Sequence, residues 1–193
     1  MKQTLIRSVC VYCGSGFGAN PIFKQTAWDL GRILAENGIR LVYGGGSHGL
    51  MGEVANSVLQ HGGFVTGIIP EFLKTREVML HGAQEMIVTP DMHERKRLMF
   101  EKADAFVALP GGIGTLEELV EQLTWAQLDQ HDKPILMMNV ADFWKPLLVL
   151  IAHMREFQFI RQGLEVKYLV AEKVGDILPM LQQSAALRRH QRV

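Results

Sequence analysis

The chain has 193 residues, of which 48% are hydrophobic and 21% are charged. These fractions are close to those of ordinary globular proteins and exclude a disordered, collagen-like or coiled-coil chain. The 20 lysines and arginines balance the 20 aspartates and glutamates, so no overall charge favours a nucleic-acid or membrane partner. An anion-binding site, if the chain has one, must therefore be local.

The length suits a single domain, which we expect over residues 1–184. Residues 185–193 are expected to form either a flexible tail or a solvated helix extension. The N-terminal sequence lacks the features of a signal peptide, and no apolar run is long enough to span a membrane. Cys10 and Cys13 have no second pair with which to bind zinc. We therefore predict a reduced, cytoplasmic protein with no metal and no cofactor.

Short apolar runs ending in glycine or proline alternate with longer amphipathic stretches, which is typical of strand–helix units around a parallel sheet. Strands are expected at residues 8–12, 40–43, 64–69, 85–88, 105–109 and 134–138, with a weaker one at 168–170. Helices are expected at residues 22–37, 50–60, 92–102, 115–128, 143–156 and 174–183. The predicted fold class is α/β, a doubly wound, mostly parallel sheet of about seven strands with helices on both faces. Ligands of such sheets bind at the carboxyl ends of the strands.

Glycine-rich segments follow three of the expected strands, at residues 13–16, 44–52 and 110–115. Glycine lets backbone N–H groups approach a ligand, and the following helix adds unpaired donors and a partial positive charge. Any one of these segments could be no more than a tight turn, but three on one rim favour phosphate or nucleotide binding. Neither the Walker pattern nor the complete dinucleotide pattern of glycines is present.

The helix expected after Gly114 carries several acidic residues. Its spacing predicts one packed face with Leu116, Leu119, Val120 and Leu123, and another face with Glu118, Glu121, Gln122 and Trp125. Glu118 lies one turn from the expected phosphate-binding amides, so a sugar attached to the phosphate would reach it. The alternative is a solvated acid that complements the helix dipole.

A basic run at residues 92–97 opens the helix after the fourth strand. A helix N-terminus disfavours cations, so an anionic partner is expected nearby. Arg95 is a candidate for contact with the substrate, and the alternative is a solvated charged face. His48 and His93 are either acid–base groups or structural loop residues. Cys10 is expected in the core, whereas Cys13 could face the site.

Three segments together resemble the Lonely Guy (LOG) family of cytokinin riboside 5′-monophosphate phosphoribohydrolases, often labelled "lysine decarboxylase". They are PGGIGTLEE at residues 110–118, MHERK at 92–96 and GGGSHGLMG at 44–52. The similarity runs from about Ser8 to Leu181. It implies a Rossmann-like homodimer that hydrolyses the N-glycosidic bond of an adenine nucleoside 5′-monophosphate, giving the free base and ribose 5-phosphate.

By motif position, the resemblance makes Arg95 and Glu118 the catalytic pair. It implies substrate binding by Gly45, Gly46, Gly49, Met51, Gly52, Glu77, Lys96, Gly111, Gly112, Gly114 and Thr115, of which the last four form the phosphate-binding turn. Ile113 stands where the family often has an aromatic residue. The resemblance also places the helices of residues 92–100 and 115–125 near a two-fold interface.

The chemistry of the two charged residues agrees with this resemblance. Breaking a nucleoside C–N bond builds positive charge on the ribose, which the Glu118 carboxylate would stabilise while orienting an attacking water. The same carboxylate could instead hold ribose hydroxyls. Arg95 stays protonated and is expected to bind phosphate or to position Glu118 and the departing purine.

Two other functions compete with hydrolysis as interpretations of the sequence. Decarboxylation with pyridoxal phosphate needs a Schiff-base lysine and a partner for the pyridinium nitrogen, and no strand-end motif supplies them. A nucleotide or pterin-cofactor carrier on the same fold is the alternative. A carrier would need the glycine turns but has less need of the charged pair.

Overall fold

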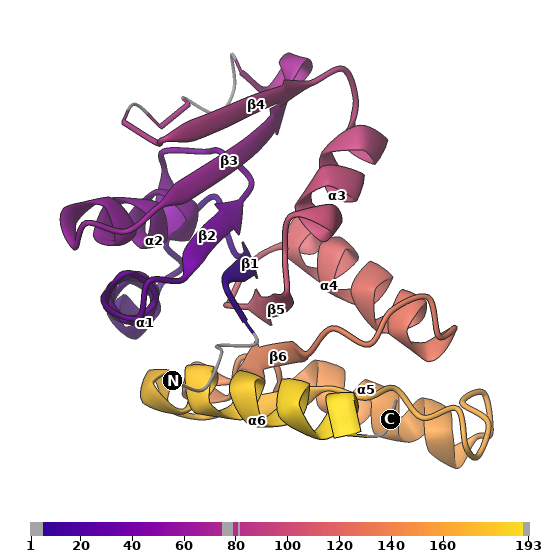
Figure 1. The fold of residues 1–193 in the computed structure, drawn as a ribbon. Coiled ribbons are helices and arrows are strands. Elements are labelled where there is room, and N and C mark those ends of the chain that lie inside the picture. The colour runs from indigo at the N-terminus through magenta and orange to yellow at the C-terminus, as the bar shows by residue number, and fades with distance from the viewer. Residues whose placement is uncertain (1–5, 75–78, 81, 191–193) are drawn as a thin grey trace.

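A computed structural model describes residues 6–74, 79–80 and 82–190 (Figure 1). Within them, seven strands form one sheet in the order β4-β3-β2-β1-β5-β6-β7, and every neighbouring pair is parallel. The strands are β1 (Ser8–Tyr12), β2 (Arg40–Tyr43), β3 (Val65–Pro70), β4 (Glu85–Thr89), β5 (Ala105–Ala108), β6 (Ile135–Met138) and β7 (Leu169–Ala171). The predicted doubly wound α/β fold is confirmed.

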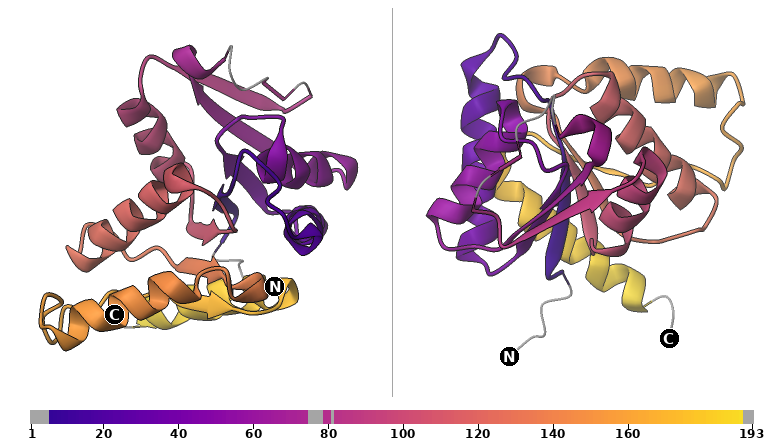
Figure 2. Two further views of the ribbon diagram at one scale, coloured as in Figure 1. Left: turned by 180° about the vertical axis from the view of Figure 1, so that it is seen from behind. Right: turned by 90° about the horizontal axis from the view of Figure 1, so that it is seen from above.

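Six α-helices cover the two faces of this sheet (Figures 1 and 2). They are α1 (Pro21–Glu36), α2 (Gly49–Gln60), α3 (Met92–Glu101), α4 (Ile113–Gln127), α5 (Lys145–Glu156) and α6 (Ile177–His190). Buried apolar residues of α1, α2 and α6 pack on one face of the sheet, and those of α3, α4 and α5 pack on the other. Among the helices of the described residues, none is long and apolar enough to cross a bilayer.

After their first residues, the central strands β1 and β2 are almost entirely apolar, because both of their faces are buried. In β1, Val9 and Val11 belong to the core under α1 and α2, whereas Cys10 and Tyr12 belong to the core under α3 and α4. The alternation follows directly from the two-residue period of a strand.

The order of the strands creates a switch point between β1 and β5. After β1, the strands β2, β3 and β4 follow one another on one side of it, and β5 then pairs with β1 on its other side. Tyr12 of β1 is in register with Ala108 of β5. The turns after these two strands are joined by a 3.0 Å hydrogen bond from Gly14 N to Pro110 O. This is the position at which open α/β sheets bind their ligands.

The expected helix boundaries differ from the observed ones by more than one residue at α4, α5 and α6. α4 starts at Ile113, two residues before the expected 115, and α5 starts at Lys145, two residues after the expected 143. Just before α5, Ala141 and Asp142 have φ of 53° and 59°, which no right-handed helix contains. Asn139 holds this turn, since its Oδ1 accepts the backbone N–H of Trp144 at 2.9 Å. α6 continues to His190, so residues 185–190 form the helix extension rather than an irregular tail.

Candidate active site

The second glycine segment, residues 44–52, is largely closed by its own neighbours. Gly45, Gly46, Gly49 and Gly52 are all buried. A Cβ on Gly52 would collide with the carbonyl of Ser47, so a side chain has no room there. These glycines therefore allow close packing of the turn against α2, and their predicted contacts with a substrate stay predictions.

The N-terminus of α2 is also occupied by the protein itself. Leu50 N donates to Gly14 O at 3.0 Å and to Gly16 O at 3.3 Å, and Met51 N donates to Gly14 O at 3.3 Å. Met51 is buried in the core. The amides of Leu50 and Met51 therefore serve the turn after β1, and the predicted contacts of this segment with a substrate stay predictions.

The N-terminus of α4 is different, because it is open. Its N-cap residue, Gly112, has no side chain with which to cap the helix, and Gly112, Ile113 and Gly114 are exposed. A Cβ at Gly112 or Gly114 would meet nothing within 4 Å, whereas one at Gly111 would collide with the Thr115 side chain. The first amides of α4 are thus free to bind an anion, as the sequence predicts for this turn.

A cavity of about 280 Å³ lies beside this turn at the switch point. Gly111 and Gly112 line it from one side, and residues 14–18 with Phe23 and Phe143 line it from the other. A larger hollow of about 480 Å³ lies at the opposite end of α4, near Gln127 and Arg188. We place the end of the site at the glycine turn in the first cavity, because Gly112, the N-cap of α4, lines it, whereas Arg95 and Glu118 are not among its lining residues.

Arg95 crosses from α3 to the ends of two strands. Its side chain is 8% exposed, and its Nε donates to Ile68 O at 3.1 Å while Nη2 donates to Gly44 O at 3.4 Å. A Cβ on Gly44 would collide with the guanidinium, which explains the glycine at that position. The basic run on α3 is thus not a solvated face at Arg95.

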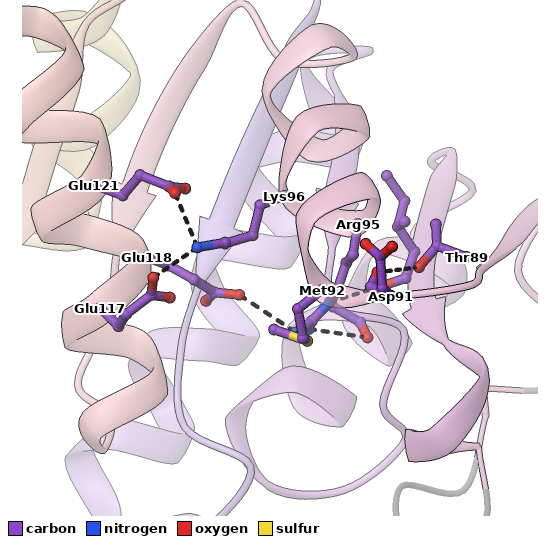
Figure 3. A network of polar contacts seen from close by, with 10 residues as sticks. Thr89, Asp91, Met92, Arg95, Lys96, Glu117, Glu118 and Glu121 are labelled. Carbon is purple, nitrogen blue, oxygen red and sulfur yellow. Dashed lines mark hydrogen bonds and ion pairs between the residues drawn. The ribbon is translucent and has the colours of Figure 1, made fainter.

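Glu118 of α4 is the anionic partner expected for this cation. Its Oε1 lies 3.6 Å from Arg95 Nη1, and its side chain is 11% exposed (Figure 3). Burial, with a smaller contribution from Glu117, raises the pKa of Glu118 to about 7 against the opposing effect of Arg95. Near neutral pH the carboxyl group is therefore present in both protonation states.

Lys96 lies beside this pair but does not point to an open site. Its Nζ is 2.7 Å from Glu117 Oε1 and 2.9 Å from Glu121 Oε1, so it joins α3 to α4. The N-terminus of α3 has its own anion, because Asp91 accepts the amide of Glu94 at 2.9 Å. Contact of Lys96 with a substrate stays a prediction.

The prediction of a packed face and a polar face on α4 is partly wrong. Glu118 and Gln122 are buried, whereas Val120, assigned to the packed face, is 42% exposed. The Gln122 carboxamide has no hydrogen-bond partner among the described residues. Tyr12 and Cys10 share a hydrogen bond and interact electrostatically with Glu118, and burial raises the pKa of both groups. Helical spacing puts Gln122 on the face of Glu118 but does not show that this face is buried, and the strand pattern does not single out Tyr12.

The other candidates do not join the charged pair. His48 contacts Ser47 Oγ at 3.1 Å, His93 is exposed, and neither ring hydrogen-bonds Glu118 in the described part of the chain. Cys13 is buried in the core beneath α1 and α2 rather than facing the site. Glu77 lies outside the described residues. No group of three potential metal ligands occurs within the ranges that the structure describes.

Comparison with known proteins shows which family the chain belongs to. A family model described as possible lysine decarboxylase matches residues 51–181. A probable cytokinin riboside 5′-monophosphate phosphoribohydrolase of Oryza sativa subsp. japonica is 45% identical, over 94% of this chain and 79% of the relative. The chain belongs to the Lonely Guy family. The cytokinin riboside 5′-monophosphate phosphoribohydrolase of Rhodococcoides fascians is 44% identical, over 87% of this chain and 85% of the relative.

Solved structures with the same fold have much lower sequence identity to this chain. A molybdenum cofactor binding protein of Rippkaea orientalis has a TM-score of 0.70 and 21% identity, with 95% of this chain and 98% of that chain covered. The molybdenum cofactor carrier protein of Chlamydomonas reinhardtii has a TM-score of 0.68 and 22% identity, with 93% and 98% covered. At these identities the likeness shows the fold alone.

The raised pKa of Glu118 predicts how stability varies with pH. Between its ordinary value of 4.5 and about 7, the folded protein holds a proton that the unfolded chain has lost. The free energy of unfolding therefore falls as pH rises through this window, by up to about 3 kcal/mol from this group. The Glu118→Gln variant cannot lose a proton there, so its stability relative to wild type should be greater at pH 8 than at pH 5.

Urea denaturation at both pH values measures this difference. Glu36→Gln is the matched control, because Glu36 is an exposed carboxylate paired with Arg32 on α1. Its stability relative to wild type should change little between pH 5 and pH 8. The same result for Glu118→Gln would show that Glu118 is an ordinary, solvated acid.

Proposed function

We propose that the protein hydrolyses the N-glycosidic bond of an adenine nucleoside 5′-monophosphate, a cytokinin riboside 5′-monophosphate or AMP, to the free base and ribose 5-phosphate. The observation that carries this proposal is the buried Arg95–Glu118 pair close to the open N-terminus of α4. Relatives that span most of the chain carry the name of this activity.

The glycine turn and α4 provide the seat for the phosphate. The exposed amides at Gly112, Ile113 and Gly114 lie at the positive end of the α4 dipole, which favours a dianion without requiring a lysine. Glu118 follows on the same helix, about one turn from the amides. A ribose attached to the bound phosphate would extend toward its carboxylate.

Glu118 acts in this mechanism as the ionised carboxylate. As the C–N bond breaks, positive charge develops on the ribose ring, and a carboxylate held in a water-poor setting stabilises that charge. The same group can orient the water that attacks the anomeric carbon. Arg95 remains charged and positions Glu118 through their 3.6 Å contact.

The carrier alternative rests on the shared fold of the molybdenum cofactor proteins. A binding protein needs the open turn of α4, but it gains nothing from burying an arginine and a glutamate together, since each loses its hydration. The charged pair therefore favours turnover over binding alone.

Release of free base is the direct test of the reaction. Purified protein is incubated with AMP and with an isoprenoid adenosine monophosphate, and the products are separated by chromatography. Wild type should release base, with kcat/KM rising through pH 7 as Glu118 ionises. Glu118→Gln should lower kcat on the order of 10²-fold, because the charge that opposes the ribose cation is lost.

Glu36→Gln serves again as the control and should retain the wild-type rate. Nucleotide binding without release of base would favour the carrier. A Glu118→Gln variant with an unchanged kcat would remove Glu118 from the mechanism.

The position of the phosphate is tested by two glycine variants. A Cβ at Gly112 enters open space, so Gly112→Ala should fold normally but raise KM for AMP on the order of tenfold by crowding the phosphate. A Cβ at Gly111 collides with Thr115, so Gly111→Ala should instead lower the thermal midpoint of unfolding. A wild-type KM for Gly112→Ala would place the phosphate elsewhere.

We further propose a cytoplasmic homodimer with α3 and α4 near its two-fold axis. The reduced state of Cys10 and Cys13 suits a reducing compartment. The exposed apolar side chains of Ile113 and Val120 on α4 support an interface there, whereas Met99 is core and supports none. Light scattering at micromolar concentration should give twice the mass of the chain. The Val120→Lys variant should give a lower measured mass, closer to that of a single chain. A monomeric wild type would contradict this proposal.

A further inference from the structure

Gln122 of α4 is a polar side chain in the interior of the protein. It is fully buried, and neither Oε1 nor Nε2 of its carboxamide has a hydrogen-bond partner within residues 6–74, 79–80 and 82–190. A buried amide without a partner has given up its hydrogen bonds to water and destabilises the fold. Methionine has a similar volume and would fill the same place without this loss. Packing alone therefore does not explain a glutamine at this position.

The backbone at Gln122 is held by a residue beyond the end of α4. Burial lowers the pKa of His131, so its ring is neutral near pH 7. Its Nδ1 accepts the amide of Lys133 at 3.2 Å, which leaves the proton on Nε2, and Nε2 donates to Gln122 O at 3.2 Å. A new contact of the carboxamide must therefore come from rotation of the side chain.

Gln122 shares a face of α4 with Glu118. The two residues are four positions apart, and both are buried. Long side chains on a helix lean toward its N-terminus, which is the direction of Glu118 from Gln122. Glu118 has its 3.6 Å ion pair with Arg95, but neither of its carboxyl oxygens takes part in a hydrogen bond with any described residue. An acid without a hydrogen bond thus lies one turn from an amide without one.

A carboxamide can stabilise this acid once the acid has lost its proton. Nε2 is a donor, and a hydrogen bond to an ionised carboxylate is stronger than one between neutral groups. Burial raises the pKa of Glu118 to about 7, so the carboxylate and the protonated acid coexist near neutral pH. The amide therefore gains a strong partner in only one of the two states.

Building on the proposed function, we propose that Gln122 is a positioning residue, whose side chain rotates to donate a hydrogen bond from Nε2 to the ionised Glu118 carboxylate. The bond fixes the direction of the carboxylate while positive charge develops on the ribose. Gln122 itself does not contact the substrate. Its loss should therefore lower kcat and leave substrate binding largely unchanged.

The other groups around Glu118 stay in place when Gln122 is replaced. The charged and titratable groups that face Glu118 are Arg95 and Lys96 from α3, Glu117 and Glu121 from α4, and Cys10 and Tyr12 from β1. A donor to the carboxylate favours its charged form and lowers the pKa of Glu118. Removal of the amide alone should therefore raise that pKa.

The test compares Gln122→Met with Gln127→Met as the matched control. Gln127 lies on the same helix, and its carboxamide already has a partner, because Nε2 donates to Leu164 O at 3.0 Å. Gln122→Met should lower kcat for AMP hydrolysis roughly tenfold, change KM by less than about threefold, and move the acidic limb of kcat/KM to higher pH. Gln127→Met should keep the kcat and the pH profile of wild type.

Thermal unfolding separates positioning from a loss of structure. At pH 5 Glu118 is protonated, so Gln122→Met only removes an amide without a partner, and its thermal midpoint should lie above that of wild type. At pH 8 this advantage should shrink, because wild type then has the hydrogen bond. The difference between Gln127→Met and wild type should be the same at both pH values. A Gln122→Met variant that is slower and also less stable than wild type at pH 5 would make Gln122 a structural residue and overturn the proposal.

A measurement without substrate distinguishes this inference from the proposed reaction. Carbon-13 NMR of the Glu118 carboxyl group follows its titration in the ligand-free protein. The midpoint should be higher in Gln122→Met than in wild type and Gln127→Met. If wild type released no base while this order held, the reaction would be wrong and the hydrogen bond would stand. An equal midpoint in Gln122→Met and wild type would refute the hydrogen bond whether or not base is released.

Discussion

The site depends on one electrostatic constraint, the burial of a cation and an acid between α3 and α4. Arg95 and Glu118 are each almost fully removed from water, yet their closest atoms are 3.6 Å apart. Arg95 recovers part of its lost hydration by donating to Ile68 O and Gly44 O. Glu118 recovers less, and its raised pKa is the consequence. The protein around Glu118 thus holds it as a group that changes protonation state near pH 7.

The rim around this pair uses glycine for two separate purposes. Gly44, Gly52 and Gly111 are required because another group of the protein occupies the place of a side chain. Gly112 and Gly114 leave space that no described residue fills. The first group holds the turns and the guanidinium in place, and the second keeps one helix N-terminus open. The second group leaves room for a ligand beside α4.

Much of the fold and part of the site followed from the sequence for physical reasons. Strands buried on both faces are apolar throughout, so β1 and β5 were readily found, and glycines after them marked the switch point. Arg95 and Glu118 were found through the family resemblance of their segments. The weak strand signal near residue 168 was correct to within one residue of β7.

What the sequence could not predict depended on neighbours distant along the chain. Glu118 and Gln122 look solvated by helical spacing, but α3 and β1 cover that side of α4. The glycines of residues 44–52 resemble an anion cradle until the carbonyls of Gly14 and Gly16 take up the amides of α2. Lys96 forms ion pairs with Glu117 and Glu121 of α4, which the basic run of α3 alone does not predict. Only tertiary structure decides such cases.

A crystal structure with AMP bound to the Glu118→Gln variant would test the central claim most directly. The account predicts the phosphate on the first amides of α4, with the anomeric carbon of the ribose beside the residue 118 side chain. A phosphate seated away from α4, or a residue 118 side chain turned from the sugar into solvent, would contradict it.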